Sequence, residues 1–546
     1  MPTAGKVLTT ILKKRGLFPT TSIIILMLII IGAILLRIHL LPMPLERDEG
    51  EYAYAGQLIM DGLLPYQHIY SMKLPGIYFA YAAIMIICGE TSTAIHTGLL
   101  FIHILTILII FIAIKRLFDE ETSLLSCATF TVLSNNPYLL GHFAHTEHFV
   151  IFFALASLVL LLQAFDSGRR TAFILAGTAA GMCFLMKQSG AVYIAFGLSF
   201  ILAAALMQHK LIIQELIQRG IIFLIGAVIP YILTCCFFAV NGIFDNFWFW
   251  TYSYAREYAS LVSPGTGWDL FIHQISRIIS FSPLLWITAL LGFIFLRFKY
   301  RQKEQLCFFM MFLIFSVLAV TPGFYFREHY FILILPSISL GAAIGFSSLK
   351  TFGTNLFHNG GNIIMLLVLV PILFIPIYRE RSFLFEMSPR QAIRFTHGMD
   401  PFPESMAIAN YIAAHTTLQD KIAVIGSEPQ IYFYSHRRAA TGYVYMYQLM
   451  ERHKFSLTMQ VAMIKEMVSQ RPAFIVVVSS PTSWLAKEGS YRLIFAWLRE
   501  YLENNYGIVG IVEQTSLTTT NYIWEQALTD YRVKSPYWLA VYRRNK

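Results

Sequence analysis

The chain has 546 residues and a formal net charge of +10, with 56% hydrophobic and only 13% charged residues. A soluble domain usually carries about a quarter charged residues, so this composition excludes a wholly soluble protein and indicates an integral membrane protein. The positive charge is better explained by lysine and arginine in cytoplasmic loops than by nucleic acid, which is not an expected partner. The six cysteines all lie in apolar segments, so the sequence has neither a disulfide framework nor a zinc-site spacing.

Apolar runs near the roughly 20 residues that a helix needs to cross a bilayer recur along the first two thirds of the chain. The first is too long for a cleaved signal and has no small-residue cleavage site, so we expect it to be retained. We predict eleven spans, at about 20–41, 95–114, 123–141, 149–165, 171–186, 191–207, 220–240, 276–296, 305–321, 329–346 and 362–378.

Short basic connections indicate the orientation of these runs. They are Lys13-Lys14-Arg15, Lys115-Arg116, Arg169-Arg170, His209-Lys210 to Arg219, Arg297 to Lys303, and Lys350. Because short cytoplasmic loops collect positive residues, we predict a multi-pass protein of the plasma (inner) membrane, with its amino terminus inside and its carboxyl terminus outside. The apolar stretch 76–88 would invert this pattern if it spanned. With about 13 residues it is too short, and we interpret it as a juxtamembrane or re-entrant helix.

This pattern predicts that the chain has three parts. Residues 1–380 are predicted to form a helical transmembrane domain, with 42–94 as its first outer loop, and 381–400 a linker. Residues 401–546 alternate β-rich runs with amphipathic helices, which predicts a small extracytoplasmic α/β domain. Its strands are expected at 422–426, 473–478, 508–512 and 538–542, and its helices at 404–414, 457–469 and 491–504.

Charged residues concentrate where the predicted helices meet the outer side. Asp48, Glu49 and Glu51 stand just beyond the first run. An ordinary acidic helix start in a solvated loop would by itself explain these three. Further charged residues lie in other outer loops or at the outer ends of other predicted spans, namely Lys73, Glu147, Lys187, Arg256, Glu257, Arg327 and Glu328. Acids and bases converging from several segments favour a polar cavity over separate headgroup anchors.

Such a cavity suits transfer from a lipid-linked phosphate donor. Carboxylates can take a proton from an attacking hydroxyl or steady positive charge on a sugar ring. Lysine and arginine can bind a phosphodiester and stabilise it as it departs. A transporter usually places its charges in interrupted helices at the bilayer midplane, whereas here they lie at helix ends and in loops. The pattern therefore favours chemistry at the membrane surface over translocation.

The run Arg47-Asp-Glu-Gly-Glu-Tyr-Ala-Tyr54, followed by Lys73-Leu-Pro75, closely resembles the GT-C glycosyltransferases. Within them it is most similar to the dolichyl-phosphate-mannose protein mannosyltransferase and aminoarabinose transferase superfamily. The segments 327–336 and 424–437 also look like this superfamily. The resemblance implies an inverting hexosyl- or pentosyltransferase that moves one sugar from a polyprenyl-phosphate donor, among membrane lipids, to a cell-envelope acceptor (glycolipid, glycan or protein).

The resemblance also implies site residues. Asp48 would be the general base or essential first-loop acid, Glu49 its support, and Glu147 the second acid. Substrate-binding candidates, including those that would handle the donor phosphate, are Tyr52, Lys73, Lys187, Arg327, His329 and Tyr330.

Two departures from the superfamily stand out. Met72 occupies the position where aminoarabinose enzymes carry a glutamate, so the carboxylate that the resemblance would assign to a metal is missing. The second acid is a glutamate where related enzymes often have aspartate. No cofactor is firmly implied, and metal dependence stays open: His142, His145 and His148 are ligand types that would share a face only if their stretch is helical.

Two other functions fit parts of the pattern. A polyprenol-linked glycan flippase or a scaffold of envelope assembly would need no transfer chemistry, but a flippase should show paired interrupted helices, and the sequence shows none. An oligosaccharide ligase or polymerase would need the same carboxylates and phosphate-binding cations. The identities of sugar and acceptor depend on the shape of a cavity built from distant segments, and the sequence does not give them.

Overall fold

The computed structural model describes residues 20–207, 212–299, 303–357 and 361–545. They form two compact units, which we describe separately. The helical unit comprises Thr97–Phe237, Val262–Glu386 and the described part of Met1–His39, and the mixed unit comprises Leu40–His96, Phe238–Leu261 and the described part of Met387–Lys546. The basic residues 13–15 and 209–210, used above to predict orientation, lie outside the described residues.

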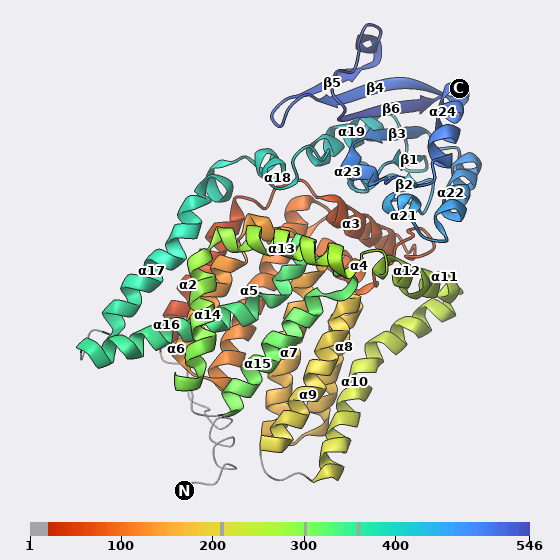
Figure 1. Cartoon of the computed structure of the whole chain (residues 1–546). Coiled ribbons are helices and arrows are strands. Elements are labelled where there is room, and N and C mark those ends of the chain that lie inside the picture. Colours follow the sequence, from red (N-terminus) through yellow and green to blue (C-terminus); the bar gives the residue numbers. More distant parts are fainter. Residues whose placement is uncertain (1–19, 208–211, 300–302, 358–360, 546) are drawn as a thin grey trace. The chain divides into compact units, whose positions relative to one another are not determined.

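The helical unit is a bundle of long apolar helices, in which α8 packs beside α7 and α9, and α9 beside α15 (Figure 1). Most of α5 and α10 also belongs to it. Its helices are α2 (Thr20–Ile38), α5 (Ser92–Leu117), α6 (Glu120–Leu133), α7 (Thr146–Ser167), α8 (Arg170–Met186), α9 (Ala191–Met207), α10 (Ile213–Val240), α13 (Pro264–Phe281), α14 (Pro283–Lys299), α15 (Lys303–Val320), α16 (Leu335–Phe357) and α17 (Gly361–Arg379).

Within the described residues, seven helices are long and apolar enough to cross a membrane, or eight if the bent pair α13–α14 forms one span. The chain is thus a multi-pass membrane protein. Three further apolar helices are shorter, at Gly76–Cys88, Arg170–Met186 and Glu304–Val320. The predicted count of eleven spans stays a prediction.

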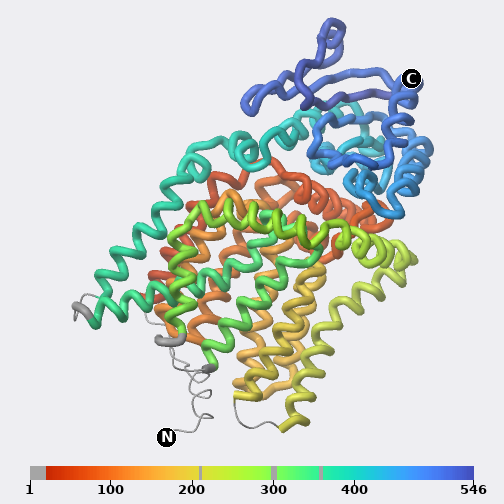
Figure 2. Tube along the Cα trace, viewed as in Figure 1, coloured from red at the N-terminus to blue at the C-terminus, as the bar shows by residue number. Residues whose placement is uncertain are grey.

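Two of the expected spans differ in form from straight helices. The run predicted at 123–141 ends its helix at Leu133, because Asn136 and Pro137 start a separate 3-10 turn. The run predicted at 276–296 is broken at Ser282, where α13 and α14 meet at 103° (Figure 2). Pro283 explains this break, since proline disfavours helical geometry in the residue before it.

The packing of α8 against α10 depends on small residues. A Cβ atom at Gly177 would lie 2.0 Å from the carbonyl oxygen of Phe223, and one at Gly181 would lie 2.2 Å from that of Ala227. Glycines four residues apart let two helix backbones approach this closely, as is common in membrane bundles. A larger side chain at either position would push α10 away from α8.

The mixed unit contains a six-stranded sheet with the order β2-β1-β3-β6-β4-β5 among the described residues. β1 pairs in parallel with β2 and β3, and the remaining pairs are antiparallel. The strands are β1 (Lys421–Ile425), β2 (Arg438–Ala439), β3 (Phe474–Ser479), β4 (Tyr506–Gln514), β5 (Thr520–Trp524) and β6 (Trp538–Arg544). The helices α19 (Phe402–Ala414), α22 (Ser456–Gln470) and α24 (Leu493–Asn505) accompany the sheet (Figure 1).

The four strands and three helices predicted in this region are confirmed to within a few residues. The sequence did not predict β2, which has only two residues, or β5, whose side chains are all half-buried and show no alternation. The proposed limits of the three domains, at 380 and 400, stay predictions.

Two helices of the first loop also belong to the mixed unit, α3 (Arg47–Met60) and α4 (Gly76–Cys88). The helix predicted at 76–88 is confirmed, although its relation to the membrane stays a prediction. α3 packs against α4 and against α20 (Gln430–Ser435). A Cβ atom at Gly50 would lie 2.7 Å from the backbone nitrogen of Gln430, so only glycine allows this approach. Tyr54 stacks on Tyr432 at 5.1 Å, which further fixes α3 on the C-terminal region.

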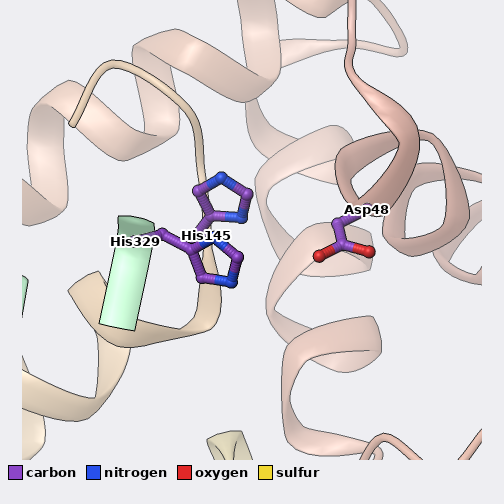
Figure 3. A group of neighbouring side chains, drawn as sticks. All are labelled: Asp48, His145 and His329. Atoms are coloured by element: carbon purple, nitrogen blue, oxygen red, sulfur yellow. The ribbon is translucent and has the colours of Figure 1, made fainter. Parts of the chain in front are cut away.

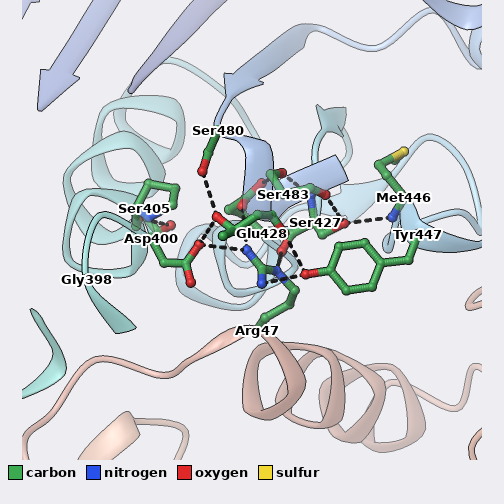
Figure 4. Close-up of polar contacts among 12 residues, drawn as sticks. Arg47, Gly398, Asp400, Ser405, Ser427, Glu428, Met446, Tyr447, Ser480 and Ser483 are labelled. Atoms are coloured by element: carbon green, nitrogen blue, oxygen red, sulfur yellow. Dashed lines mark hydrogen bonds and ion pairs between the residues drawn. The ribbon is translucent and has the colours of Figure 1, made fainter. Parts of the chain in front are cut away.

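A buried arginine joins the start of α3 to that region (Figure 4). The Arg47 guanidinium donates to the Ser427 carbonyl at 2.7 Å and to the Tyr447 hydroxyl at 2.7 Å. It also donates to Asp400 at 3.2 Å and to Glu428 at 3.4 Å. Arg47 is 7% exposed and Glu428 fully buried. Burial raises the pKa of Glu428 to about 7, although Arg47 acts in the opposite direction.

The raised pKa of Glu428 predicts a pH-dependent stability. The folded protein holds this proton up to about pH 7, whereas the ordinary value is 4.5. The contribution of protonated Glu428 to the free energy of unfolding is therefore complete below about pH 4.5 and is lost as the pH rises through 7. We expect the apparent melting temperature of the detergent-purified protein to fall between pH 5 and 7.5, by an amount equivalent to at most about 3 kcal/mol. Glu428→Gln should flatten this slope, and equal slopes in wild type and variant would contradict the prediction.

Candidate functional site

The first-loop residues of the mixed unit form a cluster around one lysine. The Lys73 ammonium donates to Asp48 Oδ1 at 2.8 Å and to Glu51 Oε2 at 3.0 Å. It also lies 4.5 Å from the centre of the Tyr52 ring and 5.3 Å from that of Tyr445. We call these five residues the first-loop cluster. Asp48 and Glu51 meet Lys73 together because residues three apart on a helix share a face.

The balance of charge keeps Lys73 protonated. Burial alone would lower the pKa of Lys73, but the carboxylates of Asp48 and Glu51 outweigh it and hold the pKa above its usual value. An ammonium group has three hydrogens to donate, and two of them serve these carboxylates. The cluster can therefore offer a permanent positive charge with one donor left for a bound anion.

The acidic side chains of α3 differ in their exposure to solvent. The side chains of Asp48 and Lys73 are each 20% exposed, whereas that of Glu51 is 2% exposed. Glu51 is also held from the inner side by the Tyr78 hydroxyl, which donates to Oε1 at 2.7 Å. Asp48, shown in Figure 3, is thus the carboxylate of the cluster that a substrate could reach.

Glu49 lies inside the protein, where it helps to build the start of α3. Its backbone nitrogen donates to the Glu46 carboxylate at 2.9 Å, and its own carboxylate accepts from the Glu46 nitrogen at 3.3 Å. This reciprocal capping box satisfies donors that a helix start leaves unpaired. Glu49 also contacts His96 at 3.0 Å. The acidic helix start considered from sequence is therefore present, and it fixes the turn that carries Asp48.

The helical unit holds a second cluster, which we call the Glu147 cluster and which consists of Glu147, Lys187 and Tyr330. The Lys187 ammonium donates to Glu147 Oε1, and the Thr146 hydroxyl donates to Oε2 at 3.0 Å. The same ammonium lies 3.3 Å from the centre of the Tyr330 ring. Glu147 is fully buried in the first turn of α7, and Lys187 caps the end of α8 with 19% of its side chain exposed.

A buried arginine positions the segment that leads into Glu147. Arg37, at the end of α2, donates to the carbonyl oxygens of Gly141 at 2.8 Å and Ser134 at 2.9 Å. It thereby closes the loop between α6 and α7. A Cβ atom at Gly141 would lie 2.0 Å from the Ser134 oxygen, so glycine is required at this crossing. This closed loop fixes where α7 begins, and therefore where Glu147 lies in its first turn.

The three histidines considered as metal ligands do not come together. α7 begins at Thr146, so His142 and His145 precede the helix and the shared face that the prediction required is not formed. His142 packs edge-on against Phe383, and His145 stacks on His329 with ring centres 4.0 Å apart (Figure 3). In the part of the chain that the structure describes, His142, His145 and His148 do not bring their ligand atoms within 4.8 Å of one another.

Arg327 opens the segment that carries His329 and Tyr330. It precedes the 3-10 helix η5 (Glu328–Ile334) and lies 5.8 Å from the centre of the Tyr325 ring. The following residue, Glu328, accepts from Gln274 at 3.0 Å. This contact ties η5 to α13, which places Tyr330 over Lys187.

The structure thus gathers the candidates in two groups. Asp48, Tyr52 and Lys73 meet in the first-loop cluster, and Glu147, Lys187 and Tyr330 meet in the second. Sequence reasoning missed two members of the first cluster as site residues. Glu51 could have been found from its spacing to Asp48, three residues along one helix face. Tyr445 lies 397 residues from Asp48 in the sequence, and no local pattern marks it.

Residues 73–251 match the sequence model of the dolichyl-phosphate-mannose-protein mannosyltransferase family. No curated protein sequence is similar enough to count as a match. Among solved structures, ArnT from Cupriavidus metallidurans bound to undecaprenyl phosphate aligns with a TM-score of 0.56 at 14% identity, over 96% of this chain and 98% of that one. The archaeal oligosaccharyltransferase AglB from Archaeoglobus fulgidus, in complex with an inhibitory peptide and a dolichol-phosphate, aligns with a TM-score of 0.55 at 10% identity, over 94% and 75%.

At these identities the structural matches establish a shared fold, and the family match adds a sequence relation over residues 73–251, about a third of the chain. The family match includes the Lys73-Leu-Pro75 motif. The predicted resemblance of this chain to the GT-C glycosyltransferases of the mannosyltransferase and ArnT-like superfamily is therefore confirmed.

Proposed function

We propose that the protein is an inverting glycosyltransferase that moves one sugar from a polyprenyl-phosphate donor to a cell-envelope acceptor. The observation that carries this proposal is the partly exposed pair of Asp48 and Lys73, 2.8 Å apart at the start of α3. It combines a candidate base with a permanent cation, the two groups that transfer from a phosphate donor needs. The undecaprenyl phosphate bound to ArnT and the dolichol-phosphate bound to AglB support a polyprenyl-phosphate ligand in this fold.

In the proposed reaction Asp48 takes the proton of the acceptor hydroxyl. The acceptor oxygen then forms a bond to the anomeric carbon of the sugar, while the bond between that carbon and the phosphate oxygen breaks. The phosphate leaves with the electron pair and gains negative charge, which the remaining donor of Lys73 stabilises. A single displacement of this kind inverts the configuration of the sugar.

Glu147 and Lys187 supply a second acid–cation pair. Because Glu147 is buried, we assign it to holding and orienting Lys187, whose partly exposed ammonium would bind the donor phosphate together with Arg327. His329 and Tyr330 are proposed to contribute to substrate binding beside Lys187. Glu49 supports Asp48 indirectly, through the capping box of α3.

The orientation of the chain is part of this proposal. We place the amino terminus in the cytoplasm and the first loop with the C-terminal domain outside it, in the plasma membrane, because the basic connections fall in alternate loops. Mass spectrometry of envelope glycolipids, glycans and glycoproteins, from cells with and without the gene, tests the function. A lost mass increment would identify both the sugar and its recipient, and identical spectra would contradict the proposal.

Asp48→Asn should reduce sugar transfer by at least about a hundredfold, because the amide cannot accept the acceptor proton. The variant should express and melt like the wild type, since asparagine keeps the shape of the side chain. Asp61→Asn is the matched control, because Asp61 ends the same helix with 57% of its side chain exposed and lies outside both clusters. If Asp48→Asn, expressed in cells that lack the gene, restored the lost mass increment to the wild-type level, Asp48 would not be the base.

Glu147→Gln should lower transfer by about ten- to a hundredfold, since the neutral amide no longer holds the Lys187 ammonium in place. We expect a higher KM for the lipid donor, whereas the KM for the acceptor stays close to that of the wild type. Glu215→Gln serves as control, since Glu215 is 53% exposed and pairs with Arg219 of the same helix. An unchanged donor KM in Glu147→Gln would show that Lys187 does not depend on this carboxylate.

A further inference from the structure

We infer that Tyr445, from the C-terminal domain, is a positioning residue for Asp48, so that this domain completes the transfer site rather than only covering it. The inference rests on the proposed function, in which Asp48 is the base. Its first support is a direct contact. The Tyr445 hydroxyl donates to Asp48 Oδ1 at 3.2 Å, the same oxygen that accepts from Lys73.

Tyr445 is suited to remain a donor. Its burial and the nearby Asp48 carboxylate raise the pKa of the Tyr445 hydroxyl well above its usual value, so the hydroxyl keeps its proton at physiological pH. A hydrogen bond donated to a carboxylate favours its ionised form and restricts its rotation. The ionised, oriented form is the one that a general base requires.

The backbone around both residues is fixed by one serine (Figure 4). Arg47, the residue before Asp48, donates through Nε to the Ser427 carbonyl at 2.7 Å. The backbone nitrogen of Met446, the residue after Tyr445, donates to Ser427 Oγ at 2.9 Å. Ser427 itself is held by Ser483, through bonds of 2.8 Å and 2.6 Å. The distance between Asp48 and Tyr445 therefore follows from a shared anchor, independently of their own contact.

The ring of Tyr445 is also fixed, so its hydroxyl has a defined direction. It packs edge-on against Tyr447 with ring centres 4.7 Å apart, and Lys73 lies over its face at 5.3 Å. The Tyr447 hydroxyl in turn donates to the Thr482 carbonyl and accepts from Arg47. Removal of the Tyr445 hydroxyl alone would leave these packing contacts in place.

Tyr445→Phe isolates the hydroxyl. The assay uses purified full-length protein and, as donor, undecaprenyl phosphate bearing the sugar that the mass comparison identifies. We expect kcat to fall about tenfold, with the donor KM close to wild type and only a small drop in the melting temperature from the lost hydrogen bond. The acidic limb of the pH–kcat profile should move upward by about half a pH unit, because the carboxylate loses a bond that favours its charged form. A merely structural role would not move this limb.

Tyr443→Phe is the matched control. Tyr443 lies two residues away, and its ring packs against Tyr70 at 4.8 Å without contact to Asp48. The same loss of a hydroxyl should leave kcat and the pH profile unchanged there. Equal kcat values for wild type and Tyr445→Phe, with Asp48→Asn inactive, would overturn the inference while the proposed function stands. Full activity of Asp48→Asn would overturn the proposed function and the inference with it.

A thermal double-mutant cycle tests the contact without reference to activity. If Tyr445 and Asp48 interact as described, the destabilisation caused by Tyr445→Phe should vanish in the background of Asp48→Ala, which removes the acceptor oxygens, so the double variant should be less destabilised than the sum of the two single effects. Additive effects would show that the hydroxyl and the carboxylate are not coupled, which would overturn the inference whatever the transfer assay shows.

Discussion

The ion network of Arg47 is the interaction on which the rest of the mixed unit depends. A buried guanidinium is costly unless acceptors surround it, and here a carbonyl, a phenol, the Asp400 carboxylate and the Glu428 carboxyl group do so. All four acceptors come from the C-terminal region, whereas Arg47 begins the helix of the first loop. Because an uncompensated buried charge would be strongly unfavourable, the start of α3 packs against the C-terminal region in the one position where Arg47 meets these acceptors. Asp48, the next residue, takes its position from that constraint.

The first-loop cluster shows how a carboxylate pair can sit together beside a membrane. Asp48 and Glu51 would repel each other if Lys73 did not bond both, and burial would lower the pKa of Lys73 if they were absent. Lys73 therefore stabilises the two carboxylates, and they stabilise its ammonium form. Asp48, Glu51 and Lys73 together carry one net negative charge. Uptake of the acceptor proton by Asp48 would remove that charge as negative charge develops on the departing phosphate, so the cluster would come close to neutrality during transfer.

The sequence predicted those features that depend on neighbours in the chain. The helix at 76–88 and the strand at 474–479 follow from local hydrophobicity, and the Asp48 and Lys73 motifs are short enough to recognise directly. It did not show where a local element bends, as at Ser282, where an apolar run of span length contains a bend of 103°. The three histidines do not share a helix face, since α7 starts four residues after His142. Hydropathy measures how apolar a run is and carries no information on the direction of its axis.

Tyr445 marks a different limit, because its role follows from contacts across almost 400 residues. Nothing in the neighbouring sequence distinguishes Tyr445 from Tyr443 or Tyr447, yet the three hydroxyls have different surroundings. Tyr445 bonds Asp48, Tyr447 bonds Arg47, and Tyr443 packs on Tyr70. The difference arises from Ser427, which sets the register of both chain segments at once. A change in the C-terminal domain that displaced Ser427 would therefore move Arg47 and Tyr445 together, and the carboxylate between them with both. In the proposed mechanism, the bonds that hold the C-terminal domain together therefore also position the base.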